Sequence, residues 1–149
     1  MITRSVIRGL TVWQPMCWCI AEGIKPLENR TFRPWAGVTH VAIHAGLKWH
    51  AEHARQIREY LELYVPDRTD PQIVHGAVVA VARLGKIWTE DDPQIETQQW
   101  FSGPLGWSLE EYTATKRALY ERERVNLENR TNYDHYLDYY FVQRTIMNE

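Results

Sequence analysis

The sequence predicts an α+β fold, in which short strands and helices belong to the same domain. Apolar runs rich in β-branched residues at 8–13, 39–45 and 76–87 are typical of strands. Residues 48–64 instead carry apolar side chains at helical spacing. The chain has 149 residues, of which 44% are hydrophobic, and this is enough for one domain with a buried core.

The first elements are predicted to be a strand, a short helix and a second strand. Residues 8–13 alternate and include a tryptophan, as strands commonly do. Pro15 suits the first turn of a helix, and Gly23 suits its end. Residues 27–32 follow and are predicted to form the second strand.

Two more strands and a longer helix are expected in the middle of the chain. Residues 39–45 alternate as a third strand, and 48–64 form the amphipathic helix. Residues 76–87 are almost continuously apolar at their start, which predicts a strand buried on both faces. An acidic loop comes next, and Gly103–Trp107 is predicted to be a turn.

Signals conflict from Ser108 onwards. Ser108-Leu109-Glu110-Glu111 has the pattern of a capping box that opens a helix, whereas a strand that starts at Gly106 would complete a barrel. We expect helices for most of residues 113–149, as an extension of a domain that spans residues 1–112. Aromatic residues at helical spacing in this extension predict a packing face: Tyr133, Tyr136, Tyr140 and Phe141.

Composition argues against several classes of protein. The chain has no run of about 18 apolar residues and no apolar leader, so we expect a cytoplasmic protein with no membrane partner. Cys17 and Cys19 are too close in sequence for a disulfide between them to stabilise a fold, and we interpret them as small buried side chains. His44, His50, Glu52 and His53 lack the order of a known metal motif, so we predict no metal and no cofactor.

Charge is distributed unevenly along the chain. The net charge is −2, which argues against a generally basic nucleic-acid binder. Residues 1–48 nevertheless carry six basic and two acidic side chains, so the remaining residues carry a net charge of −6. A local basic face for phosphates is one interpretation, and ordinary scatter over the surface is the other.

The segment Gly23-Ile24-Lys25-Pro26-Leu27-Glu28-Asn29-Arg30 is the most informative part of the sequence. Three ionisable side chains, Lys25, Glu28 and Arg30, lie within six positions just after the predicted helix end. Strand alternation places Glu28 and Arg30 on one face and Asn29 on the other. The cluster either serves a pocket or forms an ion network that fastens the helix exit to the sheet.

Five sequence features, in the order in which they follow one another along the chain, resemble the ASCH domain of the PUA-like superfamily. The matching residues are Leu10, Gln14, Pro15, Gly23, Lys25, Glu28, Arg30, Ile43, His44, Ala45, Gly76–Val79 and Gly103–Trp107. The resemblance spans roughly residues 8 to 110. It implies a small PUA-like β-barrel with flanking helices, and a groove beside the barrel that recognises RNA or a modified base.

Some ASCH proteins are linked to hydrolysis of acylated cytidine and others to RNA cleavage. In the amidohydrolase members a threonine follows the lysine by three positions, and here that position is Glu28. This chain therefore departs from the amidohydrolase pattern at one of its residues.

Our first hypothesis is a domain that binds single-stranded RNA or a modified nucleoside. Cationic side chains bind phosphate, aromatic side chains stack on unpaired bases, and amide side chains read base edges. The candidate binding residues of these three kinds are Trp13, Gln14, Asn29, Arg30, Trp35 and Trp107.

Two further hypotheses belong to other classes. The second is a metal-independent hydrolase, with Lys25, Glu28 and His44 as candidate catalytic residues, which cuts an amide on a base or an RNA phosphodiester. The third is a protein-interaction module, whose tyrosine-rich tail docks a partner or forms a homodimer.

Overall fold

A computed structural model describes residues 6–114 of the chain, with side chains from Ile7 to Glu111. In this range the elements are β1 (Val6–Gln14), α1 (Met16–Ala21), β2 (Leu27–Arg30), β3 (Val38–Trp49), α2 (Ala51–Tyr60), β4 (Val78–Thr89), the 3-10 helix η1 (Ile95–Thr97) and β5 (Leu105–Ala114). The α+β class is confirmed. The helices and the homodimer contact predicted for residues 113–149 concern residues outside the described range. The exception is residues 113 and 114, which form the end of β5.

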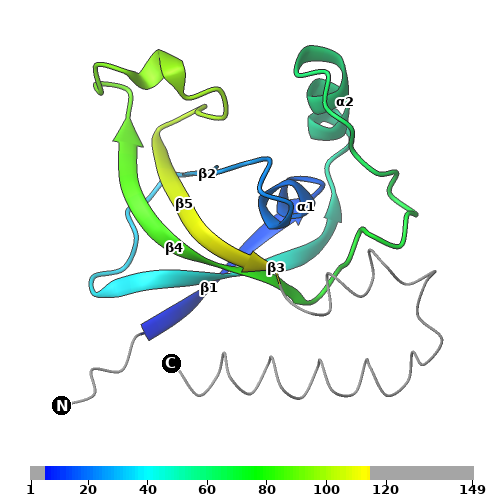
Figure 1. Cartoon of the computed structure of the whole chain (residues 1–149), viewed down its shortest axis with the longest axis horizontal. Helices are drawn as coiled ribbons and strands as arrows, with labels where there is room; N and C mark the ends of the chain where they lie inside the picture. Colours follow the sequence, from blue (N-terminus) through cyan, green and yellow to red (C-terminus); the bar gives the residue numbers. More distant parts are fainter. Residues whose placement is uncertain (1–5, 115–149) are drawn as a thin grey trace.

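All five strands belong to one mixed sheet, with the order β1-β3-β4-β5-β2. β1 pairs with β3 in parallel, and the other three pairs are antiparallel. The sheet curls strongly, so that β4 and β5 arch over α1 (Figure 1). The barrel expectation is thus met as a half-barrel, whose two free edges are β1 and β2.

Helix α1 fills the hollow of the half-barrel and makes contacts with β1, β3, β4 and β5. Its end follows the prediction, because Gly23 adopts a φ of +75° and donates its N–H to the carbonyl of Ile20 at 3.0 Å. Cys17 and Ile20 of α1 are buried against the inner faces of the strands. One core cluster therefore forms between this short helix and the concave face of the sheet, and a second cluster packs Trp18 and Cys19 of α1 against Ile57 of α2.

Strand β5 decides between the two alternatives that the sequence leaves open after Gly106, in favour of the strand, and it also includes Leu105–Trp107 from the predicted turn. The strand pairs with β4 on one side and β2 on the other, and it buries Trp107 and Leu109. A capping box stabilises a helix by only about 1 kcal/mol, whereas a helix here would leave the backbone groups of two neighbouring strands unpaired. β5 also continues to Ala114, beyond the expected domain boundary at residue 112.

Helix α2 is shorter than predicted at both ends. β3 extends through Trp49, which pairs in register with Gln14 of β1, so the first residues of the predicted helix belong to the sheet. His50 is the N-cap, and its Nδ1 accepts a hydrogen bond from the backbone N–H of His53 at 3.3 Å. The helix ends at Tyr60, and two residues later Glu62 has a φ of +52°.

Strand β4 is buried on both faces only in its first half. Val79, Ala80 and Ala82 are buried, but Arg83 and Lys86 are exposed and the other residues from Leu84 on are half-buried. The prediction of two-sided burial is wrong for this second half, which rises away from α1 toward the η1 loop (Figure 1). Neither α1 nor α2, the α-helices of residues 6–114, has the length and apolar character needed to cross a membrane.

Candidate functional site

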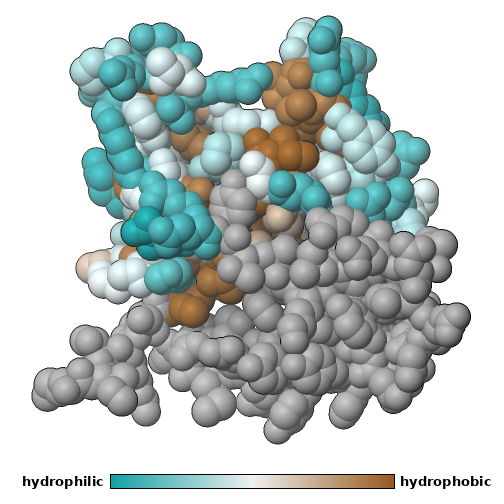
Figure 2. All heavy atoms as spheres, viewed as in Figure 1, coloured by the Kyte–Doolittle hydropathy of each residue, from teal (hydrophilic) through white to brown (hydrophobic). Residues whose placement is uncertain are grey.

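A pocket of about 660 Å³ opens on the hollow side of the half-barrel, between α2 and the loop that follows η1. Figure 2 shows the molecule hollowed between two hydrophilic crests, with hydrophobic residues gathered between them. Polar, charged and aromatic side chains share its lining, which consists of Thr11, Val12, Trp13, Met16, Lys25, Glu28, Asn29, Arg30, His53, Gln56, Ile57, Tyr60, Leu61, Gln99, Trp100, Phe101 and Ser102. Its volume is within the range of small-molecule sites.

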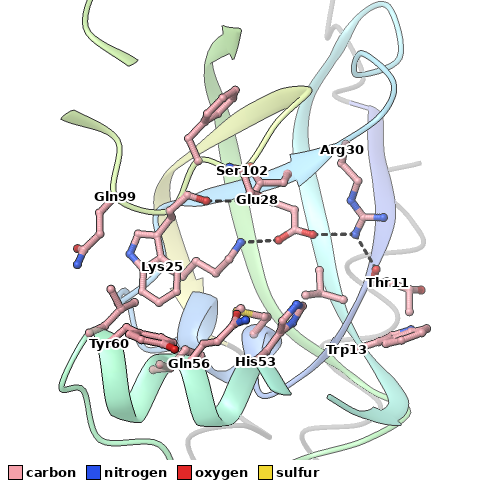
Figure 3. A pocket seen from close by; sticks show the side chains of 17 residues that line it. Thr11, Trp13, Lys25, Glu28, Arg30, His53, Gln56, Tyr60, Gln99 and Ser102 are labelled. Atoms are coloured by element: carbon pink, nitrogen blue, oxygen red, sulfur yellow. Dashed lines mark hydrogen bonds and ion pairs between the residues drawn. The ribbon is translucent and has the colours of Figure 1, made fainter. Parts of the chain in front are cut away.

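Lys25, Glu28 and Arg30 form one ion network in the wall of this pocket (Figure 3). The Nζ of Lys25 lies 2.7 Å from Oε2 of Glu28 and also donates to the carbonyl of Leu27. Oε1 of Glu28 lies 3.1 Å from Nη2 of Arg30. The predicted placement of Glu28 and Arg30 on one face of the strand is therefore confirmed.

The Lys25–Glu28 pair of the network is nearly withdrawn from solvent, and the side chain of Arg30 is 23% exposed. Lys25 is 3% exposed and Glu28 is 8% exposed. One carboxylate between two cations leaves a net charge of +1, so the network can attract an anion or polarise a carbonyl oxygen. A buried pair of this kind is expensive to desolvate and adds little stability by itself, which is an argument for a role in binding.

His53 of α2 points toward this network from the opposite side (Figure 3). Partial burial lowers the pKa of His53, and the neighbouring His50 and Lys25 lower it further, while Glu28 and Glu52 act in the opposite direction. Within residues 6–114 neither ring nitrogen of His53 has a hydrogen-bond partner. The pocket thus contains a neutral imidazole that can accept or donate a hydrogen bond.

Asn29 holds the 99–102 loop, which forms the wall of the pocket across from α2. Its Nδ2 donates to the carbonyl of Trp100 at 2.8 Å, and its Oδ1 accepts from the N–H of Ser102 at 2.8 Å. The two ends of the amide therefore bind backbone groups of the residues immediately before and after Phe101. Asn29 thus shapes the pocket, and these two hydrogen bonds leave the second N–H of its Nδ2 unused.

Trp13 and Gln14 are adjacent in sequence but have different surroundings. The indole of Trp13 is 45% exposed and lines the pocket. Gln14 is 1% exposed, donates from Nε2 to the carbonyl of Val74 at 2.7 Å and accepts from the N–H of Trp18 at 2.9 Å. Gln14 is thus engaged with the backbone, and the structure does not bring it to the pocket as a base-reading group.

Three other predicted residues also lie outside the pocket lining. Trp107 is fully buried, and its Nε1 donates to the carbonyl of Phe32 at 3.0 Å. Trp35 packs edge-on against Phe32 and Trp107, with ring centroids 5.7 and 6.0 Å apart. His44 lies on β3, where its Nδ1 is 3.2 Å from the hydroxyl of Thr11.

The pocket residues of α2 and of the 99–102 loop are not among the site residues predicted from the sequence. A usable signal existed for α2, because His53 and Gln56 are polar side chains beside Tyr60 and Ile57 on the amphipathic face. No comparable signal marks Trp100, which follows an acidic loop without periodicity. The hydrogen bond from Asn29 to its carbonyl, and its packing against the cluster that contains Trp18 and Ile57, bring it to the site.

Metal ligands are not assembled in this part of the chain. Within residues 6–114 no three His, Cys, Asp or Glu side chains lie together in a way that could hold a metal ion. His50 and His53, one of the pairs considered from the sequence, instead stack face to face, with centroids 3.6 Å apart and an interplanar angle of 7°.

Comparison with protein-family models and with curated proteins found no match to this sequence. The geometry of the pocket and the resemblance of the sequence motifs are therefore the basis for assigning a function.

Proposed function

We propose that this chain is an ASCH-type domain that binds single-stranded RNA or a modified nucleobase in the pocket beside Lys25. The observation that carries the proposal is a nearly buried cation network, of net charge +1, in the wall of a pocket otherwise rich in aromatic side chains. Such a combination suits a ligand with both a flat ring and an anionic or carbonyl oxygen.

Each part of the network has a chemical role in this proposal. Lys25 has three N–H donors and uses two of them in the protein, so one remains for a base carbonyl or a phosphate. The carboxylate of Glu28 can accept from the exocyclic amine of a base such as cytosine. Trp100 and Tyr60, from opposite walls, supply aromatic surface for the ring.

Binding to single-stranded RNA and to a panel of acylated and methylated nucleosides tests the proposal. We expect Lys25→Ala to abolish retention of the ligand, and wild-type affinity for RNA to fall as salt rises. Gln56→Glu, an exposed change in the lining, should weaken RNA binding through charge repulsion without disturbing the buried network.

Gln94→Glu is a matched control, because Gln94 is exposed and lies outside the pocket lining. Equal RNA binding by wild type, Lys25→Ala and Gln56→Glu would show that the ligand does not use this pocket. Circular dichroism of each variant separates loss of binding from loss of folding.

A second function, a hydrolase for an acylated base, is favoured by His53. The imidazole is neutral near pH 7 and faces the same cavity as Lys25. In this reaction water gives a proton to His53 while its oxygen bonds to the amide carbon, and Lys25 donates to the resulting oxyanion. The C–N bond then breaks, and the proton passes from His53 to the leaving nitrogen.

Mass spectrometry of the incubated nucleosides distinguishes hydrolysis from binding. An enzyme releases the deacylated base and the free acid, and His53→Gln loses this turnover while it retains the substrate. Retention of an intact nucleoside by wild type, without any product, rules out hydrolysis and leaves binding as the function.

A further inference from the structure

The indole of Trp13 is held outward at the mouth of the pocket by its surroundings. Val12 and Gln14 on either side of it are buried, so strand alternation directs Trp13 away from the core. The ring approaches β3 closely at Gly46, where an added Cβ would lie 2.9 Å from Cδ1 of Trp13. A large apolar ring thus packs against β3, while Trp13 as a residue is 45% exposed.

A row of rings connects this indole with the inside of the pocket. The centroids of Trp13 and His50 are 6.0 Å apart at a tilt of 34°, and His50 stacks on His53 at 3.6 Å. His50 is held by its N-cap hydrogen bond, and His53 lines the cavity. Flat side chains therefore continue from the interior of the pocket to the outer surface.

Lys48 adds a positive charge at the outer end of this row. Its Nζ lies 4.6 Å from the centroid of the Trp13 ring, and within residues 6–114 no carboxylate is within ion-pair distance of it. The nearby Glu52 is engaged with Arg55 at 2.5 Å. An exposed cation above an exposed indole can hold a phosphate beside a stacked base.

We propose that Trp13 and Lys48 form a second subsite, which binds the base and phosphate next to the nucleotide held in the pocket. This inference rests on the proposed function, and it makes the ligand a single-stranded RNA segment of at least two nucleotides. The row Trp13–His50–His53 connects the two subsites, and the cations Lys25 and Lys48 serve successive parts of the ligand.

Calorimetric titration with free nucleosides and with dinucleoside monophosphates tests this subsite. The probes are cytidine, acylated cytidine, uridine, adenosine and guanosine, each free and within a dinucleoside monophosphate. We expect the wild type to bind at least one dinucleoside monophosphate about tenfold more tightly than its component nucleosides. Trp13→Ala and Lys48→Gln should each remove most of this gain. Lys48 lies outside the pocket lining, so Lys48→Gln should also leave the affinity for the free nucleoside within about twofold.

Two control sites elsewhere on the molecule also combine a cation with a tryptophan ring. Trp35 is 38% exposed with Arg8 5.9 Å from its ring, and Lys86 lies 3.9 Å from the ring of Trp88. Trp35→Ala and Lys86→Gln should bind every probe like the wild type, whereas Trp13→Phe should keep most of the gain.

The possible failures of the two proposals differ. Free nucleosides that bind through Lys25, with no tighter binding of any dinucleoside monophosphate, overturn the second subsite and leave the pocket assignment intact. An equal loss in Trp13→Ala and Trp35→Ala also overturns it. Absence of binding by every probe overturns both the second subsite and the proposed function.

Discussion

The guanidinium of Arg30 donates from Nη2 to the backbone carbonyl of Thr11 at 2.7 Å (Figure 3). Thr11 lies on β1 and Arg30 on β2, the two free edges of the sheet. These edges are not paired through their backbones, so a side chain bridges the opening of the half-barrel. The same guanidinium holds Glu28, and this links the shape of the sheet to the charge of the pocket.

Loss of this bridge should destabilise the protein as well as weaken binding. We expect Arg30→Ala to lower the free energy of unfolding by about 1.5–3 kcal/mol, the usual range for hydrogen bonds to charged groups. Arg30→Lys should not restore it, because one ammonium lacks the planar fork that reaches both Thr11 and Glu28. Urea denaturation measures both variants. Arg33→Ala is the control, since Arg33 is exposed, and equal stability of Arg30→Ala and Arg33→Ala would contradict the prediction.

Removal of Glu28 should cost more stability than removal of Lys25. Glu28→Gln leaves Lys25 buried beside Arg30 without a counter-charge, and breaking a buried pair in this way costs about 3–5 kcal/mol. Lys25→Met leaves Glu28 with Arg30 as its partner, so a smaller loss is expected. Denaturant unfolding of the two variants compares them directly. The reverse order of stability would show that Lys25, rather than Glu28, holds the network together.

Protonation of His53 should destabilise the fold in mild acid. Burial, together with His50 and Lys25, lowers the pKa of His53 below its ordinary value of 6.5. The unfolded chain therefore takes up this proton first, so the unfolding free energy should fall as the pH drops below about 6.5. The free energy of unfolding should stop falling once the pH is below the pKa of His53 in the folded protein.

Urea denaturation at pH 7.5, 6.5 and 5.5 measures this dependence. His53→Gln should lose less stability over this range than the wild type, and His40→Gln should behave like the wild type. If His53→Gln shows the same pH dependence as the wild type, other groups are responsible.

The two cysteines should be chemically inert in the folded protein. Burial raises the pKa of the Cys19 thiol to about 12, and burial together with the nearby Glu28 raises that of Cys17 still further. Only thiolates react readily with thiol reagents, so neither cysteine should be labelled by iodoacetamide at pH 8. Both should be labelled after unfolding in urea. Labelling of one cysteine in the native protein would show that α1 opens on the timescale of the reaction.

The hydrogen bonds of Asn29 should control the order of the pocket wall. In Asn29→Ala the amide of Ser102 loses its acceptor, so hydrogen exchange in residues 95–104 should become faster. Asn29→Asp keeps an acceptor for Ser102 and loses the donor to Trp100, so it should protect the Ser102 amide better than Asn29→Ala does. Identical exchange in both variants and in the wild type would mean that other contacts hold the loop.

Local patterns in the sequence were sufficient for much of the architecture. Val41 and Ile43 in β3 and the apolar run of β4 form strands as predicted, because burial of side chains on a pleated sheet depends on their spacing. Gly23 ends α1 because it can adopt a positive φ. The placement of Glu28 and Arg30 on one face, and the burial of Cys17 and Cys19, also follow from periodicity and residue type.

Only the tertiary structure decided which residues form the pocket. Residues 108–111 carry a helix-opening pattern, yet they form part of β5 because strands distant in sequence pair with both of its sides. His53, Trp100 and Lys25 come from three different segments and meet through long-range packing, for which no local pattern exists. Alternation along β1 directs Gln14 inward, but the tertiary structure supplies its hydrogen-bond partners, the backbone groups of Trp18 and Val74. The sequence by itself determined the charged motif and most of the elements before β5, and the closure of the half-barrel decided β5 and the side chains that surround the motif.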